Sequence, residues 1–332
     1  MGKRARLLRA TCLVLTFVTL RAAPASGQDP APDGSPVPGE APRLRFSLRP
    51  EIGYQGGTEV YELTAAISTL SVRSTLTYPV GALLVGGRAT ASYGMVELTG
   101  MLHVSATDPA GKMLDQDFIN SIELSHTESR TEAKMLVAEL SAHVRLRERP
   151  PAHGDPAFSL VGGFRHATNA FDVYGASGWQ AADGGTQVAV SLPDDLHGVH
   201  YESRYEIPFV GARVDALAGE LVSLSLEARI LSAWSHHVDD HVFRHKTGTA
   251  DMQSFGGLLA GEAAWAVAAP LYLGAHAEAQ ILHGSGGTLK QRFYADDPSS
   301  SKVEGPDTPI IDAKFAFQSD RWKLFAFVGL SF

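Results

Sequence analysis

The chain has 332 residues, a formal net charge of −8 and a single cysteine, Cys12. This cysteine lies in a segment that we expect to be removed, so disulfide scaffolds, cysteine-ligated zinc and thiol catalysis are excluded for the mature chain. An acidic exported chain is also a poor binder of nucleic acid, and no nucleic-acid partner is expected.

The N-terminal residues 1–27 have the three parts of a secretory signal peptide. Basic residues come first, an apolar segment spans residues 11–20, and Ala23-Pro24-Ala25 offers a cleavage site. Residues 28–43 are rich in proline, which predicts an extended linker without a core of its own. No later apolar run reaches the roughly 18 residues of a membrane-spanning helix. We therefore expect an exported chain whose folded part is 44–332.

From residue 44 onward the dominant pattern is an alternation of apolar and polar residues with a period of two, which predicts β-strands. One example is the set Val222, Leu224, Leu226, Ala228 and Ile230, which alternates with Ser223, Ser225, Glu227 and Arg229. The pattern predicts strands near 44–56, 68–93, 95–106, 132–147, 158–174, 200–215, 221–235, 253–269, 271–283 and 310–332. Two of them need a bulge, at 79–81 and near 318–321.

The connections between these strands alternate between short and long, which is typical of an outer-membrane barrel with short periplasmic turns and long outer loops. The last strand ends on the aromatic Phe332, as barrel-assembly signals do. We therefore predict an all-β fold, a ten-stranded antiparallel transmembrane β-barrel. A soluble β-sandwich or a lipocalin-like barrel is the alternative. Ten strands argue against a diffusion pore, because porins use more.

Two of the predicted outer connections carry paired functional groups two residues apart. One contains Asp115 and Asp117, and the other contains Asp239 and His241. Residues i and i+2 of an extended chain point to the same side, so both pairs can face a common cleft. Strand order places the pairs four strands apart, on opposite walls of the barrel mouth.

Simpler interpretations of the same residues stay open. Asp115 and Asp117 could be solvated loop acids. The second connection could instead be a zinc site, because it is rich in histidine and carboxylate groups. The residues in question are His236, His237, Asp239, His241 and His245.

The sequence resembles the omptins, outer-membrane aspartyl-type endoproteases on a ten-stranded barrel. The resemblance covers about 57–332 at low identity. The segment 113–118 (MLDQDF) is similar to the family's first acidic pair with its flanks. The stretch from 201–211 (YESRYEIPFVG) through Trp234 to 239–241 (DDH) is similar to two strands and the second half of the family's site.

The resemblance implies an endopeptidase that acts on peptide or protein substrates at the bacterial outer membrane. Asp239 would orient His241, and His241 would act as general base on a water. Asp115 and Asp117 would hold that water or the developing oxyanion from the opposite wall. Such chemistry is reasonable, because an ordinary histidine titrates near pH 6.5 and two adjacent carboxylates can share a proton. It requires no cofactor or metal, and lipopolysaccharide is expected as an activator.

The chain departs from the family around the pocket. Phe118 stands where the family has tryptophan, and His237 stands where an acid selects a basic substrate residue. Glu59 is the other candidate substrate-binding group. The residues with which the family contacts membrane lipid are mostly absent from this sequence, and Arg204 is the one candidate lipid-binding residue. It would lie on the same strand face as Glu202 and Glu206, so its side chain could also point inward. The alternative function is therefore a proteolytically inactive barrel that serves adhesion or surface binding.

Overall fold

The computed structural model describes residues 43–67, 69–107, 111–147, 155–182, 185–218, 221–296 and 312–332. The predicted signal peptide, 1–27, and all but the last residue of the predicted linker lie outside them. Within the described ranges, no helix is long and apolar enough to cross a membrane. All strands belong to the compact unit Ser35–Phe332.

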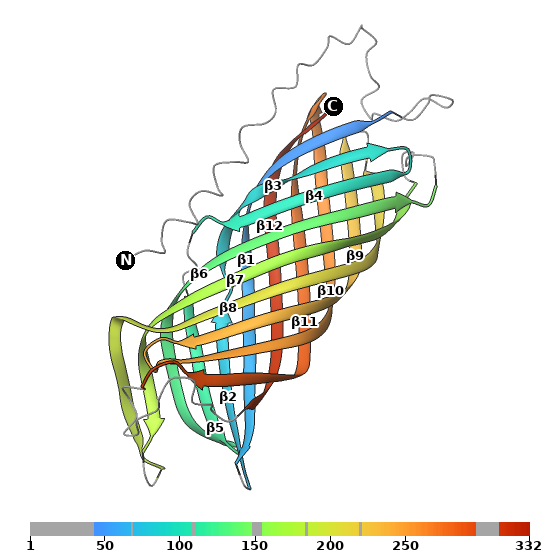
Figure 1. Ribbon diagram of the computed structural model, residues 1–332. Helices are drawn as coiled ribbons and strands as arrows, with labels where there is room; N and C mark the ends of the chain where they lie inside the picture. The colour runs from blue at the N-terminus through green and yellow to red at the C-terminus, as the bar shows by residue number, and fades with distance from the viewer. Residues whose placement is uncertain are drawn as a thin grey trace. The chain divides into compact units, whose positions relative to one another are not determined.

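The strands, numbered as in Figure 1, are all antiparallel to their neighbours. They are β1 (Arg45–Ile67), β2 (Leu70–Pro79), β3 (Ala82–Tyr93), β4 (Val96–Ser105), β5 (Gly111–Ile119), β6 (Ile122–Arg145), β7 (Ala157–Ala181), β8 (Gln187–Ala218), β9 (Val222–His241), β10 (Lys246–Ala268), β11 (Leu271–Phe293) and β12 (Ala313–Ser331).

These twelve strands close into a barrel, because β12 pairs with β1 as well as with β11. They fill ten positions around the ring. β2 and β3 lie end to end against β1, and β4 and β5 lie end to end against β6. The predicted all-β antiparallel barrel is confirmed, and closure leaves no free edge along the barrel wall.

The bulge expected at 79–81 is instead a full break in the predicted strand 68–93, since β2 ends at Pro79 and β3 begins at Ala82. Proline lacks the N–H that a strand ladder needs. The bulge expected near 318–321 is wrong, because β12 keeps one register with β1 from Lys314 to Ser331. A register shift lies instead in β11, between Gly284 and Gly287.

The outward side chains form an apolar belt with aromatic residues at both borders, as in a membrane-spanning barrel. At one border lie the exposed side chains Tyr54, Trp234, Phe255 and Trp322. At the other lie Phe46, Tyr93, Phe158, Trp265 and Phe332. Beyond Trp234 the outward residues of β9 are His236, Val238 and Asp240, two of them polar, although the strand continues to His241. Several strands therefore extend past the belt at the end that carries the candidate site.

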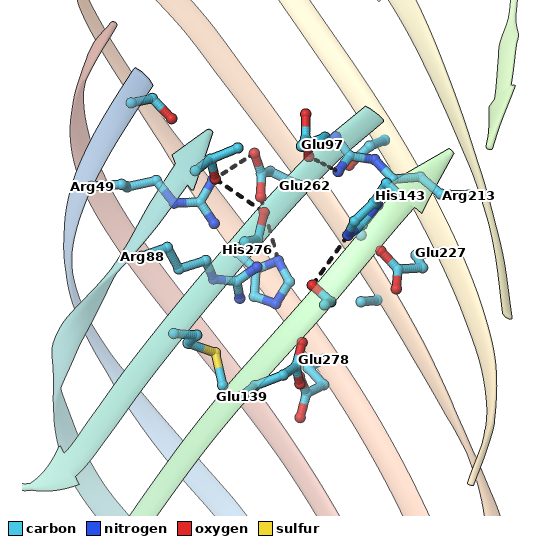
Figure 2. Close-up of a pocket in the computed structure, with 18 of the residues that line it drawn as sticks. Arg49, Arg88, Glu97, Glu139, His143, Arg213, Glu227, Glu262, His276 and Glu278 are labelled. Atoms are coloured by element: carbon cyan, nitrogen blue, oxygen red, sulfur yellow. Dashed lines mark hydrogen bonds and ion pairs between the residues drawn. The ribbon is translucent and has the colours of Figure 1, made fainter. Parts of the chain in front are cut away.

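The lumen of the barrel contains two kinds of packing. Within the belt it holds a network of ion pairs beside a polar cavity of about 160 Å³ (Figure 2). Arg165 donates to Glu139 at 2.7 Å and makes two hydrogen bonds of 2.8 Å to Glu278. Lys323 donates to Glu278 at 2.9 Å, and Arg229 donates to Glu139 at 2.8 Å. We call this set the ionic layer.

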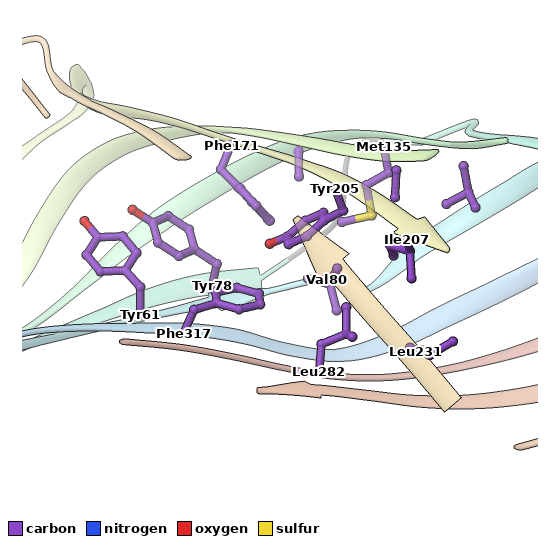
Figure 3. Packing of buried hydrophobic residues seen from close by; sticks show 14 of the residues in the cluster. Tyr61, Tyr78, Val80, Met135, Phe171, Tyr205, Ile207, Leu231, Leu282 and Phe317 are labelled. Carbon is purple, nitrogen blue, oxygen red and sulfur yellow. The ribbon is translucent and has the colours of Figure 1, made fainter. Parts of the chain in front are cut away.

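Nearer the candidate site, aromatic side chains fill the lumen (Figure 3). The aromatic layer consists of Tyr61, Tyr78, Phe171, Tyr201 and Phe315, none more than 1% exposed. Their rings lie close together; the centroids of Tyr78 and Tyr201 are 4.7 Å apart. The candidate site lies on this floor, since Tyr61 reaches it directly.

Candidate functional site

One wall of the site is β5, which carries Asp115 and Asp117. The residues lie on a strand and not on the loop that the sequence suggested, so they share a face as i and i+2 neighbours. β5 is held between β2 and β6, with Asp115 opposite Leu76 and Thr127. Ser125 Oγ on β6 donates to Asp117 Oδ2 at 2.9 Å. This bond fixes the second carboxylate.

The other wall is the end of β9, which carries Asp239 and His241. Asp239 is only 1% exposed. Its Oδ2 atom shares a hydrogen bond of 3.0 Å with His241 Nε2 and accepts one of 2.9 Å from the hydroxyl of Tyr61. The carboxylate is therefore locked from two sides, and the imidazole is oriented by it.

The electrostatics show that the two walls interact. Burial raises the pKa of Asp115 to about 7, and the charges of Asp117 and Asp239 add to the rise, while Lys246 and Arg244 oppose it. Burial also acts to raise the pKa of Asp239, but the charge of His241 and its hydrogen bond outweigh burial and leave that pKa lowered. Asp239 is thus a carboxylate at neutral pH, whereas Asp115 exchanges its proton there.

Each wall has one buried carboxylate oxygen without a hydrogen-bond partner among the described residues. These atoms are Asp115 Oδ1 and Asp239 Oδ1. Buried polar atoms are nearly always satisfied, so unsatisfied ones at a titrating pair indicate acceptors for a ligand or solvent.

Glu59 and His237 lie in the interior, and both are fully buried. Glu59 accepts hydrogen bonds from Tyr205 at 2.8 Å and Asn169 at 3.1 Å, and it is paired with Arg321. His237 shares bonds of 2.7 Å with the Tyr201 hydroxyl and 2.9 Å with Ser235 Oγ. Burial lowers the pKa of His237 to about 3, so its ring is neutral at physiological pH.

Arg204 points outward from β8, just beyond the apolar belt. Its Nε atom donates to Glu202 at 2.5 Å. Together with Trp234, His236 and Asp251 it lines a shallow groove on the outer face of the barrel. The inward position that its parity left open is therefore not adopted.

Three residues of the site were missed by sequence reasoning. Tyr61 donates a hydrogen bond to Asp239, and Ser125 donates one to Asp117. The third is Lys246, whose positive charge attracts the acids. Lys246 offered one signal, because it follows closely after His241 and a short turn would place them side by side. The described residues contain no group of three or more histidine and acidic side chains arranged to hold a metal ion.

No protein-family model and no curated protein sequence matches the chain. Among solved structures, the outer membrane protease OmpT from Escherichia coli has a TM-score of 0.73 at 15% identity, with 87% of this chain and 97% of that chain covered. The toluene transporter TodX from P. putida has a TM-score of 0.24 at 9% identity over 87% of this chain and 90% of its own, which is too low to carry an argument. The likeness to OmpT shows the fold: the chain is a β-barrel of the outer-membrane type.

Proposed function

We propose that the chain is an outer-membrane endopeptidase of the omptin type that hydrolyses peptide bonds with an activated water. The observation that carries the proposal is that the hydrogen-bonded Asp239–His241 pair on β9 and the Asp115–Asp117 pair on β5 are linked through Tyr61, which donates to Asp239 and lies opposite Leu76, the residue opposite Asp115. Two pairs of functional groups that are far apart in the sequence lie at one end of the barrel.

In the proposed reaction, His241 takes a proton from a water as its oxygen bonds to the peptide carbonyl carbon. Asp239 orients the imidazole and stabilises the imidazolium that forms. Asp115, in its protonated form, donates a hydrogen bond to the developing oxyanion, and Asp117 assists from the same wall. Collapse of the intermediate breaks the C–N bond, and the imidazolium gives its proton to the leaving amine. No metal takes part in this aspartic-type scheme.

The pH dependence follows from this assignment. The pKa of Asp115 is raised to about 7, and the reaction uses its protonated form. Activity should therefore fall as the pH rises through about 7.

We propose that Glu59 and His237, both fully buried, act on the substrate cleft from below its aromatic floor, through their hydrogen bonds to Tyr205 and Tyr201. Glu59 is paired with Arg321, and His237 is neutral, so neither offers an unbalanced negative charge. Selection of an arginine or lysine residue in the substrate is therefore not expected from these two groups.

The proposed location is the bacterial outer membrane, reached through the signal peptide at 1–27 and supported by the aromatic-bordered apolar belt. Arg204 is the proposed lipid contact, since a guanidinium just beyond such a belt can reach lipid phosphates. Lipopolysaccharide is the proposed activator, and no other cofactor is proposed.

The test is digestion of a broad peptide library by purified, refolded protein. We expect the wild type to cleave and His241→Ala to lose about 10²–10⁴-fold in rate. Asp115→Ala should reduce kcat more than it changes KM, because its role is at the developing charge. If the wild type cleaves nothing, or His241→Ala retains full activity, the proteolytically inactive barrel that binds surfaces is the better description.

A further inference from the structure

Lys246 begins β10 directly after the turn that follows His241. The backbone N–H of Arg244 donates to the carbonyl oxygen of His241 at 3.0 Å and closes this turn. His245 adopts a left-handed conformation with φ 51°. Its ring bonds the carbonyl oxygen of Asp296 at 2.6 Å. The turn is therefore fixed on both sides, and so is the start of β10.

The register of the hairpin places Lys246 directly opposite His241. Lys246 shares parity with the buried residues Gly248, Ala250 and Met252, so its side chain is on the inner face. Directly opposed residues in an antiparallel pair have Cβ atoms about 4.5–5.5 Å apart. An inward-facing cation next to the imidazole is thus a consequence of the fold, not of a flexible loop.

The groups that face Lys246 come from every wall of the site. They are Asp115 and Asp117 on β5, Asp239 and His241 on β9, and Arg244 in the turn. Burial and the charge of Arg244 lower the pKa of Lys246, while Asp239, Asp115 and Asp117 act to raise it. The effect is mutual: among the groups that hold down the pKa of Asp115, Lys246 is the strongest.

We infer that Lys246 is a positioning residue of this site: its ammonium group, fixed opposite His241 on the inner face, is the counter-charge to both acidic walls. The inference rests on the proposed function. It explains how three carboxyl groups can be held together at one end of a barrel. Without the cation, their mutual repulsion would keep Asp115 protonated to higher pH.

The experiment compares Lys246→Met, which removes the charge, with Lys246→Arg, which keeps it. Lys290→Met is the matched control, because Lys290 is exposed on the neighbouring strand β11, opposite Thr249. The first readout is the pH profile of peptide cleavage. The second is an infrared titration of the protonated carboxyl band of Asp115, identified by its loss in Asp115→Asn. The infrared titration needs no turnover.

We expect both readouts of Lys246→Met to move to higher pH by about one unit, the low end of what one nearby opposite charge does to a carboxyl group. Lys246→Arg and Lys290→Met should stay close to the wild type. A purely structural role for Lys246 would lower the rate at every pH without moving the infrared titration. An infrared titration of Lys246→Met that coincides with the wild type overturns the inference.

The infrared titration also separates this inference from the proposed function. If the wild type cleaves no peptide, the endopeptidase proposal fails, while the titration of Asp115 still decides the role of Lys246. If Lys246→Met does not refold, Lys246→Gln replaces it, because glutamine keeps a polar side chain at the half-buried position. The same two outcomes apply to that variant.

Discussion

Asp239 should act only through His241, and a double-mutant cycle tests this dependence. The variants are Asp239→Asn, His241→Ala and the two combined. Asp239 accepts both of its hydrogen bonds on Oδ2, from Tyr61 at 2.9 Å and with His241 at 3.0 Å. Asparagine keeps an oxygen that Tyr61 can bond, so the fold should survive. With that oxygen in the Oδ2 position, asparagine also keeps the bond to His241 but loses the negative charge that stabilises the imidazolium; with its amide nitrogen there, it can impose the wrong imidazole tautomer.

The magnitudes follow from these contacts. Loss of the general base alone is worth about 10²–10⁴-fold in rate, and an Asp→Asn change that reverses the tautomer costs up to about 10⁴-fold. The losses of independent groups would multiply, so the double variant would lose up to about 10⁶–10⁸-fold. Because His241 is the group through which Asp239 reaches the water, we expect the double variant to match His241→Ala within about threefold.

The assay is kcat/KM on a quenched peptide with protein refolded in detergent. The fold of each variant is checked by comparing the migration of unboiled and boiled samples. Asp240→Asn is the matched control, because its side chain is on the outer face of β9 and should change the rate by no more than about twofold. Losses that multiply in the double variant would refute the coupling and, with it, the assigned role of Asp239.

Further expectations concern the fold and the charges. Unboiled wild type should migrate as a compact species and boiled protein as an extended one; identical migration would contradict a closed barrel. Arg165→Met should lower the free energy of unfolding by about 3–5 kcal/mol, because it leaves Glu139 and Glu278 buried without that partner. A urea titration measures the change, and a decrease of less than about 1 kcal/mol would be inconsistent with the ionic layer. Asp115→Asn should stabilise the barrel more at pH 8 than at pH 4. The pKa of Asp115 is about 7 in the folded chain and lower in the unfolded chain, so the native side chain makes folding less favourable as the pH rises between these two pKa values. Thermal melts at the two pH values measure this difference. Chelators should leave peptide cleavage unchanged; loss that only added zinc restores would point to a metal site at the histidines of β9.

The sequence predicted the strands well where one face meets lipid and the other meets the lumen. On β9 the contrast between Ile230 and Arg229 is strong, and the strand was found there. Beyond Trp234 the outward face meets water, so polar residues occupy both faces, as the inward Ser235 and the outward His236 show. The period of two then disappears, although backbone pairing continues to His241. The long outer loops that were expected are for this reason largely strand.

The pairing of Asp239 with His241 could be expected from spacing, because it is local in an extended chain. The contact of Tyr61 with Asp239 could not, because 178 residues separate them and the register of the whole ring decides it. The ion pair of Glu59 with Arg321 spans 262 residues and was missed for the same reason. Sequence patterns identify a strand and its face, whereas closure of the barrel determines which distant side chains share a layer.

The two filled layers of the lumen also bear on how material moves through the proposed site. The aromatic layer is at most 1% exposed, and the ionic layer beneath it is closed by paired charges. Across the residues that the structure describes, the lumen below the candidate site is therefore filled by side chains. Substrate would enter and both products would leave by the same mouth, so departing fragments would compete with incoming chain for the same space.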